Sequence, residues 1–224
     1  MGLLIAAAGI VPWALIAPIN RQHRPDLPWA ALATAVFTAL LIAWLHGNGP
    51  PRNTSLERRR RLRLWPPRPV AVADGALPVG AIVLFLVLLY VVWIVVGRLT
   101  PVPDLSEYPT TAYRFSMFFM GGILAGVVEE AAFRGYMQTG LERLDPDNAV
   151  MITSLVFAVA HITQGLQALI LLGPGLFAAS MLYGTLARRT GTILPGMLIH
   201  VAGDLAYTYF GALRGDASLL FVTS

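Results

Sequence analysis

The feature that most constrains this chain is an apolar run at residues 77–96 that contains no charged side chain. A helix needs about 20 consecutive apolar residues to cross a hydrocarbon core about 30 Å thick. Inside a bilayer no water satisfies the backbone N–H and C=O groups, so a segment that spans it singly must be helical. The run therefore predicts a transmembrane helix.

Further apolar stretches of similar length bring the predicted number of spans to seven. The other six cover residues 3–19, 28–45, 113–144, 148–162, 166–187 and 193–213. Residues 113–144 are expected to form one long helix, whereas 166–187 is expected to be interrupted at Gly173-Pro174-Gly175 because proline disrupts helical hydrogen bonding. Only 12% of the residues are charged, about half the fraction in a typical soluble domain. We therefore predict an all-α, polytopic helical membrane bundle that forms one membrane-embedded domain over residues 1–224.

The positive charge of the chain is concentrated in one loop. All 16 basic residues are arginines, and seven of them lie within residues 47–76. Because this segment lies between two apolar spans, it is interpreted as a basic cytoplasmic loop touching anionic lipid head groups, and no nucleic-acid partner is expected. Arg143, Arg188 and Arg189 fall on the same side. The pattern predicts an integral protein of the plasma (inner) membrane with its N-terminus in the cytoplasm and its C-terminus outside.

Ionisable side chains occur inside the predicted spans, all of them in the second half of the chain. They are Glu129, Glu130, Arg134, His161, His200 and Asp204. A charged group at the centre of a membrane helix costs about 2.5–3.5 kcal/mol on insertion scales, so such residues usually serve a function. At about 1.5 Å per residue, Glu129, His161 and His200 lie roughly 21, 20 and 14 Å from the arginine-rich ends of their helices. They are expected to share one layer of the bilayer.

The two adjacent glutamates are expected to have different roles. Glu130 and Arg134 are four residues apart, so they share a helix face and can form an ion pair. Glu129 points about 100° away from Glu130 around the helix axis, so it need not share that arginine. A carboxylate without a neighbouring cation suits general-base chemistry. This spacing predicts a structural Glu130 and a catalytic Glu129.

The two membrane histidines also have local partners. His200 and Asp204 are four residues apart, and Phe157 lies one turn before His161 and can pack beneath its ring. Glu129, His161 and His200 could activate a water molecule alone or through a bound zinc ion. The residues by themselves leave open a metal-free hydrolase, a zinc-dependent membrane peptidase and a proton-relaying transporter.

Three segments in this half of the chain resemble, in order, the motifs of the CPBP family of type II CAAX prenyl endopeptidases and bacteriocin-processing proteins. Residues 129–135 (EEAAFRG) resemble its EExxxR motif, residues 157–161 (FAVAH) its FxxxH motif, and residues 200–204 (HVAGD) its HxxxN or HxxxD motif. Each motif lies on its own apolar stretch. The resemblance covers about residues 113–210, which are therefore expected to be the catalytic helix core.

The resemblance implies a glutamic-type intramembrane protease that uses no metal or other cofactor. It assigns catalytic roles to Glu129, His161, His200 and Asp204. It assigns supporting roles to Glu130 and Arg134, and Phe157 is expected to support the site by packing. Glu129 would activate a water, His161 would position that water, and His200 would stabilise the oxyanion. An ionised Asp204 would repel an oxyanion, so it either carries a proton or orients His200 by accepting its proton.

The resemblance also implies the kind of partner. The expected substrate is a membrane-associated peptide or protein, which is prenylated for some members of the family. A non-catalytic membrane scaffold or immunity protein of the same fold is the alternative, because some members of the resembled family have such roles. An intact set of Glu129, His161 and His200 favours the protease, since a scaffold does not need these residues.

Overall fold

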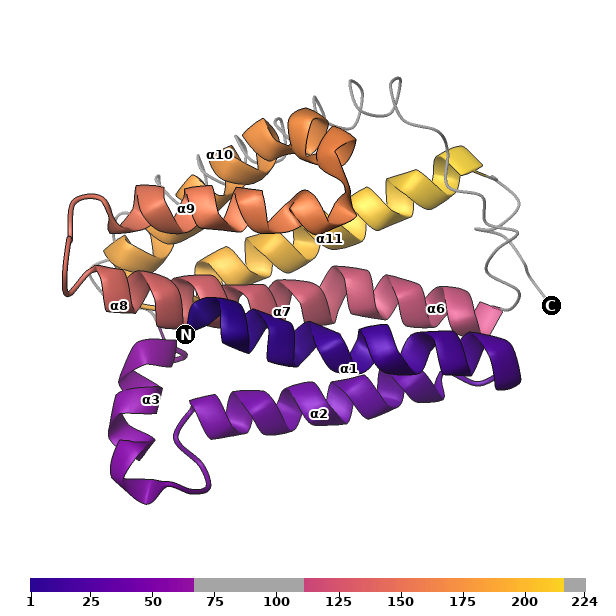
Figure 1. Cartoon of the computed structure of the whole chain (residues 1–224), viewed down its shortest axis with the longest axis horizontal. Helices are drawn as coiled ribbons and strands as arrows, with labels where there is room; N and C mark the ends of the chain where they lie inside the picture. The colour runs from indigo at the N-terminus through magenta and orange to yellow at the C-terminus, as the bar shows by residue number, and fades with distance from the viewer. Residues whose placement is uncertain (67–110, 216–224) are drawn as a thin grey trace.

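The computed structural model describes residues 1–66 and 111–215, and this part of the chain is helical without any strand (Figure 1). The predicted span at 77–96 lies outside the described residues. In chain order the helices are α1 (Gly2–His23), α2 (Trp29–Leu45), α3 (Ser55–Leu62), α6 (Thr111–Phe119), α7 (Ala125–Glu129), α8 (Thr139–Leu141), α9 (Ala149–Ala160), α10 (Leu166–Thr190) and α11 (Leu194–Gly215). The long helices pack side by side, so the predicted helical bundle is confirmed.

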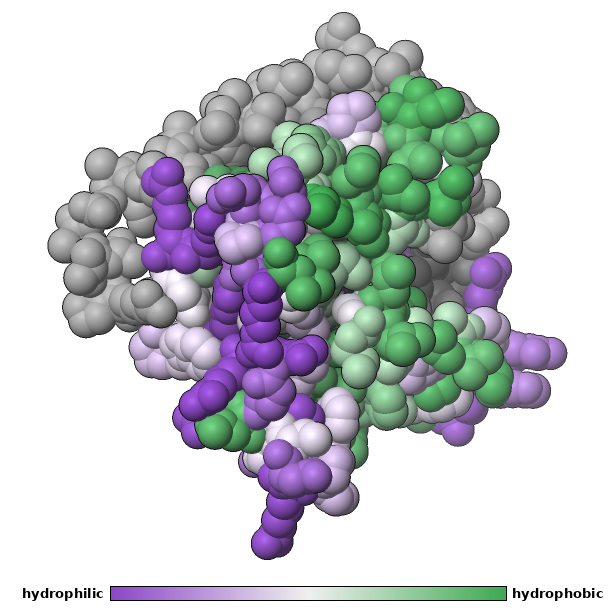
Figure 2. All heavy atoms as spheres, turned by 60° about the vertical axis from the view of Figure 1, so that its left-hand side comes forward, coloured by the Kyte–Doolittle hydropathy of each residue, from purple (hydrophilic) through white to green (hydrophobic). Residues whose placement is uncertain are grey.

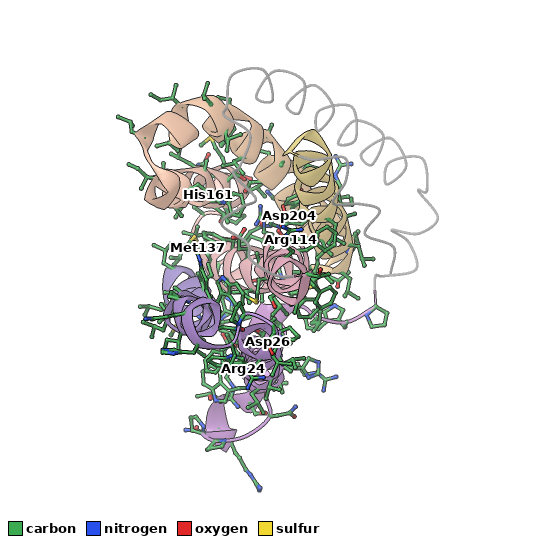
Figure 3. The ribbon with its side chains drawn as sticks, turned by 90° about the vertical axis from the view of Figure 1, so that its right-hand side faces the viewer. Arg24, Asp26, Arg114, Met137, His161 and Asp204 are labelled. Atoms are coloured by element: carbon green, nitrogen blue, oxygen red, sulfur yellow. The ribbon has the colours of Figure 1, made fainter. Side chains whose placement is uncertain are left out.

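The centre of the bundle is one continuous helical run over residues 111–141. Two of its stretches, η3 (Met120–Leu124) and η4 (Glu130–Gln138), are π-helical. The prediction of one long helix at 113–144 is thus confirmed, although the helix ends at Leu141 and not at residue 144. Helices α1 and α2 lie on one side of this run and α9, α10 and α11 on the other (Figures 1 and 3). Short π-helical segments are frequent at functional sites.

The outer surface of the bundle suits a lipid environment. Within the described residues, three helical segments are long and apolar enough to cross a membrane: Gly2–His23, Arg114–Leu141 and Leu169–Thr190. Large apolar side chains on the helix exteriors remain uncovered, including Leu4 (70% exposed) and Leu40 (65% exposed). Figure 2 shows apolar surface between hydrophilic ends of the molecule. The chain is therefore an integral membrane protein.

The predicted interruption at Gly173-Pro174-Gly175 is wrong, because α10 continues through Pro174. Proline removes one backbone donor, but membrane helices tolerate this loss because neighbouring helices, Ser and Thr side chains and small local adjustments satisfy the freed backbone group. The helix ends instead at Thr190, where Gly191 adopts a φ of 72°. Glycine is the residue best suited to this left-handed position at a helix end.

The turn between α1 and α2 is closed by Asn20, a fully buried side chain. Its amide nitrogen donates to the backbone oxygens of Arg24 (2.5 Å) and Leu27 (2.9 Å). Its side-chain oxygen accepts from the backbone N–H of Ala30 (3.0 Å) at the start of α2. One side chain thus satisfies three backbone groups in the turn and at the start of α2, where helix ends leave such groups unpaired.

Small residues bring the neighbouring helices close to the central run. A side chain added at Gly9 of α1 would meet Val128 at 2.3 Å. Likewise, a side chain added at Gly126 would meet Val201 of α11 at 3.0 Å. Membrane helices commonly approach one another through such small residues. These contacts place α1 and α11 directly against α7, the helix that ends with Glu129.

Candidate active site

The most buried charges of the described structure form an ion pair on η4. Nη1 of Arg134 lies 2.8 Å from Oε1 of Glu130, and both side chains are fully shielded from solvent. Nη2 of the same arginine donates to Oγ of Ser180 on α10 at 2.7 Å. The expected Glu130–Arg134 pair is therefore present, and it also links the central helix to α10. Removing one partner of such a pair leaves an uncompensated buried charge.

Glu130 also binds the imidazole of His200 on α11. Nδ1 of His200 lies 2.9 Å from Oε1 of Glu130. A carboxylate paired with arginine can only accept, so we assign the hydrogen to Nδ1 of the histidine. This contact joins the first of the three motif segments to the third. The orientation of the His200 ring is thereby fixed by a residue whose expected partner was Arg134 alone.

The other ring nitrogen of His200 faces two further carboxylates. Nε2 lies 3.7 Å from Oε2 of Glu129 and 3.4 Å from Oδ2 of Asp204. The Glu129 side chain is 14% exposed and that of Asp204 33%, whereas Glu130 is 0% exposed. The two adjacent glutamates therefore differ in environment. Glu130 is enclosed with a cation, and the partly exposed Glu129 lies beside the Nε2 edge of the imidazole.

His161 joins this cluster through an aromatic ring. Its ring lies 4.8 Å from that of Phe157 one turn earlier, and Phe157 in turn lies 5.9 Å from the ring of His200. Nδ1 of His161 lies 2.8 Å from the carbonyl oxygen of Phe157. A carbonyl only accepts, so Nδ1 carries a hydrogen, and in the form of the ring with a single hydrogen Nε2 is an acceptor. Figure 3 shows His161 and Asp204 on the same side of the central helix, opposite Arg24 and Asp26.

Two aromatic rings hold the Arg134 guanidinium. It lies 4.5 Å from the centre of Phe157 and 5.1 Å from that of Tyr183 on α10. Tyr183 also stacks on His200, with ring centres 4.9 Å apart and planes 21° apart. A cation over an aromatic face is attracted more strongly where water is excluded. The site thus has an aromatic frame that touches both its arginine and its central histidine.

Sequence reasoning missed the contribution of α10. Ser180 and Tyr183 carry no charge and belong to none of the three motif segments. Gly196 on α11 was missed as well, although a side chain there would lie 3.2 Å from Oε2 of Glu130 and 3.3 Å from Cβ of Tyr183. The sequence marks these positions only weakly, as small or polar residues within otherwise apolar helices. Their importance depends on which faces of α10 and α11 turn inward.

The structure therefore brings together the residues predicted from the sequence, five of them through direct contacts and His161 indirectly. Ion-pair distances connect five of them: Glu129, Glu130, Arg134, His200 and Asp204. His161 is connected to them through the ring of Phe157. Within residues 1–66 and 111–215, no three histidine or acidic side chains are arranged to hold a metal ion.

Together these features define a class of protein: a helical membrane protein with a shielded centre of carboxylates and imidazoles contributed by separate helices. Comparison with known families shows which of them this part of the chain resembles. Residues 111–206 match the family model described as type II CAAX prenyl endopeptidase Rce1-like. This match confirms the family resemblance carried by the three motifs. It supports protease activity in general and a membrane-associated protein substrate. No curated protein and no solved structure gives a significant match.

Proposed function

We propose that this chain is a glutamic-type intramembrane endopeptidase in which Glu129 activates the attacking water. The observation that carries the proposal is the contrast between two adjacent glutamates. Glu130 is fully enclosed with Arg134, whereas Glu129 is partly exposed and lies 3.7 Å from His200. An enclosed, paired carboxylate is a poor base for an external water. The neighbouring carboxylate, with solvent access and a histidine beside it, suits that role.

In the proposed reaction, Glu129 takes a proton from water as the water oxygen bonds to the carbonyl carbon of the scissile peptide. The carbonyl electron pair moves onto its oxygen and gives a tetrahedral oxyanion. When the intermediate collapses, the C–N bond breaks and Glu129 returns the proton to the leaving amine. The products are a carboxylic acid and an amine, and the enzyme regains its starting form. His161 assists by accepting a hydrogen bond from the water at Nε2.

His200 is proposed to stabilise the oxyanion. Its Nδ1–H donates to Glu130, so the ring orientation is fixed and Nε2 faces Glu129 and Asp204. Only an imidazolium donates from both nitrogens. Donors that are oriented before the reaction stabilise developing charge at little reorganisation cost. As an imidazolium, the fixed ring would donate its Nε2–H to the oxyanion while Nδ1–H stays on Glu130.

Asp204 is proposed to hold the Nε2 edge of His200 until substrate enters. Its carboxylate lies 3.4 Å from Nε2. Glu130 already occupies Nδ1, so Asp204 is not needed to orient the ring from that side. An Asp204→Asn variant should stay active, because an amide keeps the polar contact and adds a donor for an oxyanion.

The test is cleavage of a membrane-associated peptide by the purified full-length protein, with lipidated and unlipidated versions compared. Glu129→Gln keeps the size of the side chain and removes the base, so the rate should fall by about two to four orders of magnitude. His161→Ala should lower it by a smaller factor. Full cleavage by Glu129→Gln would contradict the proposal. A biological effect that survives Glu129→Ala would favour the scaffold.

The metal-free mechanism is tested separately from the role of Glu129. Activity should survive a strong chelator, and the purified protein should contain no stoichiometric zinc. Loss of activity that returns on adding zinc would support the zinc-dependent alternative, in which Glu129, His161 and His200 are ligands.

We also propose that the arginine-rich end of the bundle faces the cytoplasm, which places the N-terminus inside and the C-terminus outside. The chain has no cysteine, so single cysteines report the orientation without background. Asn53 lies beside α3, and Asp26 lies in the turn between α1 and α2 at the other end. A membrane-impermeant maleimide should label Asp26→Cys in intact cells and Asn53→Cys only after permeabilisation. The reverse pattern would invert the topology.

A further inference from the structure

Helix α3 lies across one end of the bundle, within the segment predicted to be a basic loop (Figure 1). Arg58 of this helix faces inward and is 4% exposed. Its guanidinium lies over the ring of Trp44 at 4.6 Å and donates to the backbone oxygens of Asn48, Gly49 and Pro51. One arginine of the basic run therefore anchors the helix, and α3 is a fixed structural element.

The end of α3 is attached to the central helix and to α11. Leu62 is fully buried, and the hydroxyl of Thr139 donates to the backbone oxygen of Arg61 at 3.1 Å. The backbone oxygen of Arg63 accepts from the N–H of Ile193, immediately before α11, at 3.1 Å. These contacts hold the helix in one orientation. Its outward side chains are therefore presented from a rigid base.

We define the basic face of α3 as Leu56, Arg59 and Arg60 of the helix, together with Arg52, which lies three residues before its first residue. All four are exposed, and Leu56 is 60% exposed although it is a large apolar residue. Leu56 lies three and four residues before Arg59 and Arg60, so the three share one side of the helix. The single acid of the helix, Glu57, pairs with other arginines. Among the described residues, no acid pairs with the three arginines of this face.

We propose that the basic face of α3 binds the anionic head groups of membrane lipids, with Leu56 entering the apolar layer beneath them. Three arginines that lack an acidic partner within the described structure present unopposed positive charge to a negatively charged surface. An exposed leucine among them gains from an apolar phase next to that charge, and the edge of an anionic bilayer offers both. The position of α3 is consistent with this proposal, because the helix lies at one end of the bundle (Figure 1). At that end the apolar surface gives way to hydrophilic side chains (Figure 2). An acidic protein partner would satisfy the arginines but not Leu56.

The experiment counts lipids bound to the purified full-length protein by native mass spectrometry from neutral detergent. Phosphatidylglycerol is titrated against phosphatidylcholine for the wild type, for Arg59→Gln/Arg60→Gln and for Leu56→Gln. We expect selective phosphatidylglycerol binding that weakens about fivefold for each arginine removed. Leu56→Gln should weaken binding of both lipids at this site. The matched control, Arg188→Gln/Arg189→Gln, removes the same charge at the same end but outside α3, and it should change binding less than twofold.

Equal thermal unfolding midpoints for the variants establish that the fold is intact. Unchanged phosphatidylglycerol binding in Arg59→Gln/Arg60→Gln would overturn the proposal, as would an equal loss in the control pair. Two competitors identify the ligand. Inorganic phosphate and a soluble polyglutamate peptide should each fail to displace the lipid at matched charge concentration, and displacement by either would assign the face to another partner. None of these readouts requires proteolytic activity.

Discussion

Oε1 of Glu130 lies 2.8 Å from Nη1 of Arg134 and 2.9 Å from Nδ1 of His200. One carboxylate oxygen thus neutralises the buried cation of the central helix and orients the histidine of α11. We therefore propose that the second glutamate of the motif is a positioning residue as well as an ion-pair partner. It occupies the place that an orienting acid has in a catalytic triad.

Arg134 is expected to be irreplaceable by lysine. Arg134→Gln should lower the free energy of unfolding by about 3–5 kcal/mol, because it leaves Glu130 buried without a cation. Arg134→Lys keeps the charge, but an ammonium cannot reproduce a planar group that pairs with Glu130, bonds Ser180 and stacks on two rings. Chemical unfolding in detergent micelles measures both changes. Wild-type stability in the lysine variant would show that charge alone is required.

Tyr183 is expected to position His200 through ring stacking. Tyr183→Leu removes the ring that lies 4.9 Å from the imidazole, so kcat should fall about 10- to 100-fold while KM changes little. Tyr183→Phe keeps the ring and should recover most of the rate. The split between kcat and KM separates this role from a loss of folded protein. A leucine variant as active as the phenylalanine variant would contradict it.

Gly196 is expected to tolerate no side chain. A Cβ there would lie 3.2 Å from Glu130 and 3.3 Å from Tyr183, so Gly196→Ala should force α11 outward and destabilise the fold by about 1–3 kcal/mol. Activity should fall as well, since His200 lies one turn further along the helix. Gly140→Ala is the matched control, because a Cβ at Gly140 meets nothing within 4 Å. Equal unfolding midpoints for the two variants would show that the close approach is unimportant.

The link between α3 and the end of the central helix should depend on pH. Hydrogen bonds from Arg143 and then Arg61 lower the pKa of Glu57 from its ordinary value of 4.5 to about 2. A lowered pKa means that the stabilisation is complete above pH 4.5 and is lost as the pH falls through about 2. Because Glu57 is exposed, the effect should be small and should weaken with salt. An NMR titration of the Glu57 carboxyl should give a midpoint near 2 that moves toward 4.5 in Arg143→Gln. A wild-type midpoint near 4.5 would contradict the ion pairs.

Much of the fold could be predicted from the sequence because lipid imposes simple rules. The length of each apolar stretch predicted a helix, and the four-residue spacing of Glu130 and Arg134 predicted their ion pair. Pro174 shows where such rules fail: its local effect on hydrogen bonding does not decide whether a long membrane helix continues. Arg58 shows another limit, since a residue in a basic run can be an internal anchor.

The contacts of the site could be predicted only in part. Motif spacing identifies residues that share a face, such as His200 and Asp204. It does not give the rotation of α11 against α7, and this rotation decides that Glu130 bonds Nδ1 of His200. Tyr183 was missed for the same reason, because a neutral aromatic residue in an apolar helix carries no signal until its neighbours are known.

The most direct test of the account compares Glu129→Gln with Glu130→Gln in one preparation, measuring single-turnover peptide cleavage and unfolding together. We predict that Glu129→Gln loses cleavage while unfolding like the wild type. Glu130→Gln should unfold far more easily, because Arg134 and His200 both lose their carboxylate partner. If both variants lost activity and stability to the same degree, the assignment of a catalytic role to Glu129 and a structural role to Glu130 would be wrong.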